Sequence, residues 1–216
     1  MSGIDVKICG IKDEPTLHAA LDAGAAYVGF VFYPPSPRGL TPFEASTLCE
    51  IAAGGAKRVG LIVDASDAYI AQILGSTTLD MLQLHGAETP ERVLEVQRRF
   101  GLAVIKAVPI ATAEDLARAN FYRYAADMLL FDAKPPNRPD ALPGGNAETF
   151  DWGVLNNKLP DIPWMLSGGL TLENVGEAIA AVAPQAVDVS SGVERSRGVK
   201  DPALIRAFIE AAQNAA

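Results

Sequence analysis

Pro163-Trp164-Met165-Leu166-Ser167-Gly168-Gly169-Leu170 and Ala186-Val187-Asp188-Val189-Ser190-Ser191-Gly192-Val193-Glu194 are the two stretches that decide the fold. Each is a short apolar run that ends in serine and glycine, and a helical segment separates them. Because glycine lacks a Cβ atom, backbone N–H groups at such an end can approach an anion closely. Two ends of this kind, side by side, are typical of the phosphate site formed by the last two strands of a (β/α)₈ barrel.

Six further strand–helix units precede these stretches. Apolar runs predict strands at residues 6–10, 27–33, 58–63, 81–86, 103–110 and 127–132. Amphipathic helices follow the first five of them, and the expected capping residues are Asp13, Thr41, Asp64 or Ser66, Thr89 and Thr112. Shorter helices are expected at 150–155 and 171–182, and a last helix at 203–212.

This alternation predicts an α/β fold, a single-domain (β/α)₈ TIM barrel of eight parallel strands that spans residues 1–216. Strands that are apolar throughout need both faces covered, which indicates a parallel sheet with helices on its outer face. An open, doubly wound sheet is the alternative reading. Eight regular units in 216 residues favour the closed barrel.

The composition is that of a globular protein, with 49 % hydrophobic and 20 % charged residues. No apolar run approaches the ~20 residues of a transmembrane helix, and no secretory signal is recognisable, so we expect a cytoplasmic protein. A net charge of −8 argues against nucleic acid and anionic membranes as partners. The two cysteines, Cys9 and Cys49, have neither metal-site spacing nor the density of a disulfide scaffold, which predicts reduced thiols.

The serine- and glycine-rich strand ends are the first candidate site. Backbone N–H groups near Gly168, Gly169, Ser191 and Gly192, together with a helix N-terminus, are predicted to bind a phosphate. Tight turns between strand and helix are the plain alternative.

Three further residues at strand ends or in the following loops are candidates for chemistry. Cys9 ends the first strand and is either a thiolate base or inert packing, and the charge of Lys7, on the same face, would favour the thiolate. Asp132 ends an apolar strand, where burial would favour the protonated carboxyl form of a general acid, although a cap or an ion pair explains it equally. Arg38 follows three prolines, and its planar guanidinium group is suited to binding a carboxylate. The alternative is a loop arginine that is only exposed to solvent.

Other polar residues have plainer explanations. Lys106 and Lys134 are possible Schiff-base lysines, but lysines at strand margins usually extend to water. His85 is interpreted as a hydrogen-bonded strand-end histidine in preference to a catalytic base. Cys49 is expected to pack within a helix.

Several motifs resemble one enzyme family, in the same order along the whole chain. They are Lys7-Ile8-Cys9-Gly10, Gly29-Phe30-Val31-Phe32 leading to Ser36-Pro37-Arg38, Gln83-Leu84-His85-Gly86, Phe131-Asp132, Phe150-Asp151-Trp152, and the two stretches quoted at the outset. The chain resembles the phosphoribosylanthranilate isomerases of tryptophan biosynthesis. That resemblance implies an Amadori rearrangement of N-(5-phosphoribosyl)anthranilate to 1-(2-carboxyphenylamino)-1-deoxyribulose 5-phosphate, without a cofactor or a metal.

The resemblance also implies roles for individual residues. Cys9 corresponds to the general base that removes the C2 proton, and Asp132 to the general acid that protonates the ring oxygen. Arg38 corresponds to the arginine that binds the anthranilate carboxylate, and the strand ends at 168–169 and 191–192 to the phosphate site. The partner implied is this phosphosugar–anthranilate substrate, and the protein is expected to be a monomer or a homodimer.

Two alternatives remain open from the sequence. One is another phosphosugar isomerase on the same barrel, such as the enzyme of histidine synthesis. Members of that family resemble this chain in fold but have an aspartate at the position of Cys9. The other is a barrel that binds a sugar phosphate without turnover. Residues 133–148 are the best candidate for a lid, and Ala147 stands where family members often have a further glycine.

Overall fold

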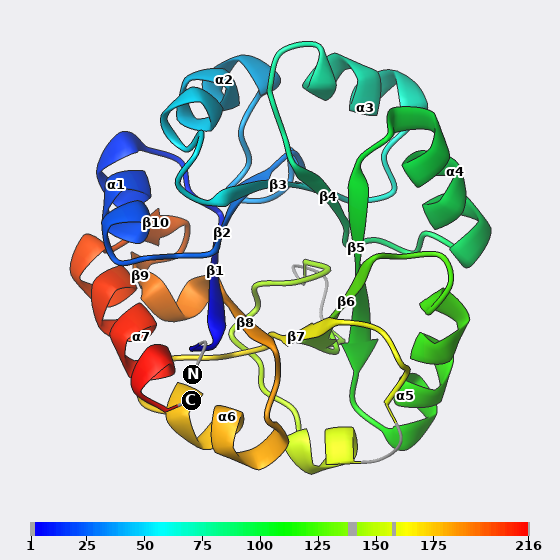
Figure 1. The fold of residues 1–216 in the computed structure, drawn as a ribbon, viewed down its shortest axis with the longest axis vertical. Coiled ribbons are helices and arrows are strands. Elements are labelled where there is room, and N and C mark those ends of the chain that lie inside the picture. Colours follow the sequence, from blue (N-terminus) through cyan, green and yellow to red (C-terminus); the bar gives the residue numbers. More distant parts are fainter. Residues whose placement is uncertain (1–2, 138–141, 157–158, 216) are drawn as a thin grey trace.

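The computed structural model describes residues 3–137, 142–156 and 159–215. Within these residues, eight parallel strands pair in chain order, and the eighth pairs with the first to close a barrel (Figure 1). The predicted barrel is therefore confirmed and the open sheet is wrong. The strands are β1 (Asp5–Cys9), β2 (Tyr27–Val31), β3 (Lys57–Ile62), β4 (Met81–Leu84), β5 (Ala103–Ile110), β6 (Met128–Ala133), β7 (Trp164–Leu166) and β8 (Ala186–Val189).

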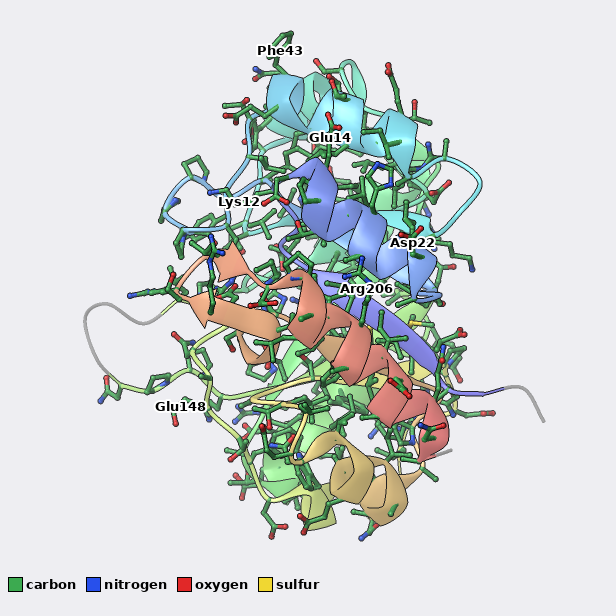
Figure 2. All side chains as sticks on the ribbon, turned by 90° about the vertical axis from the view of Figure 1, so that its left-hand side faces the viewer. Lys12, Glu14, Asp22, Phe43, Glu148 and Arg206 are labelled. Carbon is green, nitrogen blue, oxygen red and sulfur yellow. The ribbon has the colours of Figure 1, made fainter. Side chains whose placement is uncertain are left out.

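Helices form a ring outside the strands (Figure 1). They are α1 (Glu14–Asp22), α2 (Pro42–Ile51), α3 (Asp67–Leu74), α4 (Pro90–Phe100), α5 (Ala113–Ala119), α6 (Val175–Val182) and α7 (Pro202–Asn214), with 3-10 turns η1 (Asn120–Tyr122), η2 (Trp152–Asn156) and η3 (Ser191–Val193). Figure 2 shows α1 beside α7, so the ring of helices closes as the barrel does. No helix in the described part of the chain is long and apolar enough to cross a membrane.

Side-chain caps fix most helix starts where the sequence predicts them. Asp13 Oδ1 accepts the backbone N–H of Thr16, and Thr41 forms a capping box with Glu44. Of the two candidates for α3, Ser66 is the cap, whereas Asp64 has a positive φ of 46° in the preceding turn. The helix predicted at 171–182 begins only at Val175, because a turn occupies the intervening residues.

The core has two parts. Apolar side chains on the outer face of the strands, such as Phe30 and Phe131, pack against those of the helices, such as Phe208 of α7. Inside the barrel a second cluster fills the N-terminal half, and a small third cluster of Cys9, Val31 and Leu61 lies near the C-terminal ends. The interior is thus packed toward the N-terminal ends of the strands, and a cavity lies at the opposite end, where the predicted site residues are.

A short hairpin follows β8 that the sequence reading does not predict. It consists of β9 (Glu194–Ser196) and β10 (Val199–Lys200), which pair antiparallel. It lies against the Pro-rich loop after β2, because Gly198 contacts the backbone of Pro37 closely. In Figure 2 the hairpin, this loop and the segment carrying Glu148 all project on the same side of the molecule.

Candidate active site

A cavity opens at the C-terminal ends of the strands, and the space within it, counted together with the open solvent at its mouth, is about 770 Å³. It is lined by all the predicted site residues except Gly192, namely Cys9, Arg38, Asp132, Gly168, Gly169 and Ser191. Gly192 lies just behind this lining in η3, where it packs against the carbonyl of Leu170.

Cys9 ends β1 beside a buried ion pair. Lys7, two residues earlier on the same face, is fully buried, and its Nζ lies 2.6 Å from Oδ1 of Asp188, its neighbour in register on β8. Ser167 Oγ donates to the other oxygen of Asp188 at 3.0 Å. Gly29 on β2 provides the space, because a Cβ there would lie 2.9 Å from Cys9 Sγ and 3.3 Å from Lys7 Nζ.

Two opposing effects set the ionisation of Cys9. Burial raises the pKa of the Cys9 thiol above its ordinary value, while the charge and hydrogen bond of Lys7 lower it. Burial is the larger effect, so the net pKa is raised. The predicted influence of Lys7 has the expected direction, and burial opposes it.

Asp132 is the penultimate residue of β6 and lies within hydrogen-bond reach of His85. Its Oδ2 lies 3.1 Å from His85 Nε2, and its Oδ1 accepts the backbone N–H of Ala133 at 2.9 Å. The other ring nitrogen of His85, Nδ1, lies 2.8 Å from Nε2 of Gln83. His85 is therefore hydrogen-bonded at both nitrogens, as predicted, and it also lines the cavity.

Arg38 is not a solvated loop arginine. Its side chain is 4 % exposed, and Nε and Nη2 donate to the two oxygens of Glu194 at 2.7 and 3.0 Å. Nη2 also donates to the carbonyl of Gly145 at 3.3 Å. One bidentate edge of the guanidinium group is therefore engaged by Glu194, and Nη1 makes no hydrogen bond to the described residues, although Gly145 lies close to it.

Glu194 connects Arg38 to a second cation. Lys200 Nζ lies 2.9 Å from Glu194 Oε1 and donates to the carbonyl of Ser190, while Gly198 N–H donates to the carboxylate. Burial alone would raise the pKa of Glu194, but Arg38 and Lys200 outweigh it and lower the pKa from 4.5 to about 2. The carboxylate is therefore ionised throughout the neutral range, and it fixes Arg38 at the cavity wall.

The two serine- and glycine-rich ends meet as the sequence predicts. Gly168 and Gly169 have φ values of +91° and +59°, which side chains rarely adopt. Ser191 and Gly192 form the first turn of η3. Among the described residues, the backbone N–H groups of these four positions have no hydrogen-bond acceptor. Such groups lying free beside a cavity can bind an anion.

Several polar residues near the cavity are absent from the predicted set or were interpreted differently. Asp188 and Glu194 have partners that lie 181 and 156 positions away in the sequence. An acidic residue within the apolar run at 186–189 is the one signal that marks Asp188. Lys106 does not extend to water as expected, since it is 2 % exposed and donates to Glu88 and to the carbonyls of Leu84 and Gly86.

The expectations for Lys134 and Cys49 agree with the structure. Lys134 is exposed and pairs with Asp115, and Cys49 is buried in α2, where burial raises its pKa to about 12. The described residues contain no group of three or more His, Cys, Asp or Glu side chains that is arranged to hold a metal ion. Of the predicted lid, residues 138–141 lie outside the described residues, and 142–148 line the cavity.

Residues 6–211 match the model of a protein family described as N-(5'phosphoribosyl)anthranilate (PRA) isomerase. The chain is 52 % identical over 210 residues to the N-(5'-phosphoribosyl)anthranilate isomerase of Paramagnetospirillum magneticum, covering 97 % of each chain. It is 51 % identical over 215 residues to that of Rhodospirillum rubrum, covering 98 % of each.

Solved structures with the same fold agree. A phosphoribosyl anthranilate isomerase from Thermotoga maritima superposes with a TM-score of 0.87 at 38 % identity, covering 98 % of this chain and 99 % of the other. A second, described as a complex with reduced 1-(o-carboxyphenylamino)-1-deoxyribulose 5-phosphate, has a TM-score of 0.84 at 35 % identity, with the same coverage. The chain therefore belongs to the N-(5'-phosphoribosyl)anthranilate isomerase family.

Proposed function

We propose that this protein converts N-(5'-phosphoribosyl)anthranilate to 1-(2-carboxyphenylamino)-1-deoxyribulose 5-phosphate in tryptophan biosynthesis, by an Amadori rearrangement with Cys9 as base and Asp132 as acid. The observation that carries the proposal is that Cys9, Asp132 and Arg38 line one cavity together with the free backbone N–H groups of the strand ends. Family membership and the related complex with a reduced form of the product support the same reaction.

The first step opens the sugar ring. Asp132 gives its proton to the ring oxygen, the bond between that oxygen and C1 breaks, and the nitrogen lone pair forms a C1=N bond. Because Asp132 lies at the cavity wall as the penultimate residue of β6, it delivers the proton from the side of its Oδ2 atom. The product of this step is an open-chain protonated imine (iminium), whose positive charge makes the C2 proton acidic.

The second step moves a proton from C2. The Cys9 thiolate accepts it, the C–H electron pair forms a C1=C2 bond, and the C=N pair returns to the nitrogen. The resulting enolamine gains a proton at C1 and loses one from the C2 hydroxyl to become the ketone, so that atoms and charge balance. Lys7 assists because its charge lowers the pKa of Cys9 against the opposing effect of burial.

Binding groups at the two ends of the cavity set the orientation. Gly169 and Ser191, with their neighbours, hold the phosphate through backbone N–H groups, which need no positive side chain and tolerate the net charge of −8. Arg38 binds the anthranilate carboxylate through the Nη1 side that Glu194 leaves free. The C1–C2 segment of the substrate then lies between Cys9 and Asp132.

A fluorescence assay that follows consumption of the anthranilate substrate tests the proposal. We expect turnover by the wild type and a loss of about 10²–10⁴-fold in kcat for Cys9→Ser and for Asp132→Asn. Cys49→Ser, at the buried thiol of α2, is the matched control and keeps its activity. Binding without consumption by the wild type contradicts the proposal, and full activity of Cys9→Ser favours the histidine-pathway alternative.

Each group named above comes from one chain, so we propose that a single subunit is competent whether the protein is a monomer or a homodimer. A relative from Thermotoga maritima is described as dimeric phosphoribosylanthranilate isomerase from which monomers were generated. Light scattering during size-exclusion chromatography measures the state of this protein. Activity per subunit that rises with protein concentration would contradict a competent single subunit.

A further inference from the structure

Asp132 needs a proton at the start of the proposed reaction, yet an aspartic acid is ordinarily ionised at neutral pH. Its partner is His85, and histidine is the side chain that ordinarily gains or loses a proton between pH 5 and 8. The two side chains are 8 % and 9 % exposed, and Nε2 lies 3.1 Å from Oδ2. The acid of the reaction therefore touches a group suited to holding a proton at neutral pH.

The contact between His85 and Asp132 is packed closely against Gly144. A Cβ on Gly144 would clash with His85 Nε2 and would lie 2.8 Å from Asp132 Oδ2. Because both side chains are largely buried, this hydrogen bond is stronger than it would be in water.

Gln83 bonds to the far side of the imidazole. It comes from the same strand, β4, is fully buried, and places its amide 2.8 Å from His85 Nδ1. Its Oε1 has no hydrogen-bond partner in the described part of the chain. His85 alone therefore decides which way the amide faces.

Two proton arrangements fit these heavy-atom positions. In one, the amide N–H of Gln83 donates to Nδ1, and Nε2–H donates to an ionised Asp132. In the other, the amide is turned so that Oε1 accepts Nδ1–H, and one further proton lies between Nε2 and Oδ2. Only the second arrangement stores the proton that ring opening consumes.

We propose that His85 is a positioning residue that shares a proton with Asp132, and that Gln83 stabilises this state by accepting Nδ1–H through Oε1. The inference rests on the proposed function, because it takes Asp132 as the acid. The shared proton passes through Oδ2 to the ring oxygen of the substrate. The proton released from the C2 hydroxyl at ketone formation returns to the pair, so the enzyme ends in its starting state.

Nitrogen NMR of the imidazole ring tests the proton arrangement directly. The sequence has two histidines, and His18 lies exposed on α1, so His18→Gln leaves His85 as the only ring to observe. In this protein, labelled with ¹⁵N-histidine at pH 7, we expect Nδ1 to carry a proton. We also expect Gln83→Met, which lacks the acceptor, to move the ring toward the Nε2–H form. A wild-type ring protonated only at Nε2 overturns the inference.

Kinetic measurements distinguish a proton-storing role of His85 from a purely structural one. His85→Gln keeps a polar group beside Asp132 but has no titrating nitrogen. We expect kcat to fall about 10²-fold with KM changed by less than about twofold. Retention of kcat by a folded His85→Gln variant overturns the inference, and if that variant does not fold, the wild-type ring signal still decides.

The same measurements test the catalytic roles of Cys9 and Asp132 separately from the shared proton. Full activity of Cys9→Ser and Asp132→Asn would overturn the proposed roles whatever the ring shows. Loss of activity in those variants, together with unchanged kcat in His85→Gln, would overturn the shared proton alone.

Discussion

The substitution Glu194→Gln should remove the ion pair between Arg38 and the β9–β10 hairpin. It should also lower the free energy of unfolding, by an amount that depends on pH. The pKa of this carboxyl is lowered from 4.5 to about 2 because Arg38 and Lys200 outweigh its burial. A difference of that size corresponds to about 3 kcal/mol of free energy of unfolding at neutral pH. Because the folded-state pKa is the lower one, this stability is present above about pH 4.5 and is lost as the pH falls toward 2.

Urea denaturation at pH 7, 5.5, 4 and 3 measures the effect. We expect the wild type to exceed Glu194→Gln by about 3 kcal/mol at pH 7, and the two to converge as the wild-type carboxylate gains its proton. Glu95→Gln is the matched control, since Glu95 is 58 % exposed in its pair with Arg92 and is worth less than about 1 kcal/mol. A difference that stays constant from pH 7 to 3, or a cost no larger than that of the control, would refute the reasoning.

Three further outcomes are expected. Lys7→Met raises the pKa of the Cys9 thiol further, because the charge that lowers it is gone, and the pH profile of alkylation by iodoacetamide shows the shift; a profile that does not move contradicts this. Lys106→Met leaves the buried carboxylate of Glu88 without its cation and lowers the free energy of unfolding, measured by urea denaturation, by about 3–5 kcal/mol. A decrease of less than about 1 kcal/mol would contradict this expectation. Gly168 has a φ of +91°, and a Cβ added there would lie 2.6 Å from a backbone atom, whereas a Cβ at Gly101 would have nothing within 4 Å. Gly168→Ala therefore lowers the melting temperature more than Gly101→Ala does. Equal decreases would be inconsistent with the crowding.

The barrel could be predicted because local signals and the global fold agree. Apolar strands and capped helices alternate regularly, and the predicted strand at 103–110 has the same bounds as β5. The serine and glycine residues at the ends of β7 and β8 also indicated where the cavity would lie. The β9–β10 hairpin could not be predicted, because its strands are short and polar and its ion pair with the rest of the barrel joins Glu194 to the distant Arg38.

The hydrogen-bond and ion-pair partners of the site residues could not be predicted from the sequence either. Arg38 could be singled out from its stiff loop, but not its ion pair with Glu194, which lies 156 positions later. Lys106 was misread because a lysine near a strand end usually extends to water, and its acceptors are backbone carbonyls of the adjacent strand β4 and the loop that follows it. Patterns along the chain therefore indicate which residues reach the cavity, but the charges that act on them come from distant strands.

The pairing of β1 with β8 has a consequence for how the protein is made. During synthesis the N-terminus emerges first, so Lys7 and Arg38 are present long before Asp188 and Glu194, the carboxylates that neutralise them. A nascent chain that ends before β8 cannot close the ring, and it cannot bury either cation with its partner. The cavity is therefore completed only when almost the entire chain has left the ribosome, and unfinished chains have no assembled site.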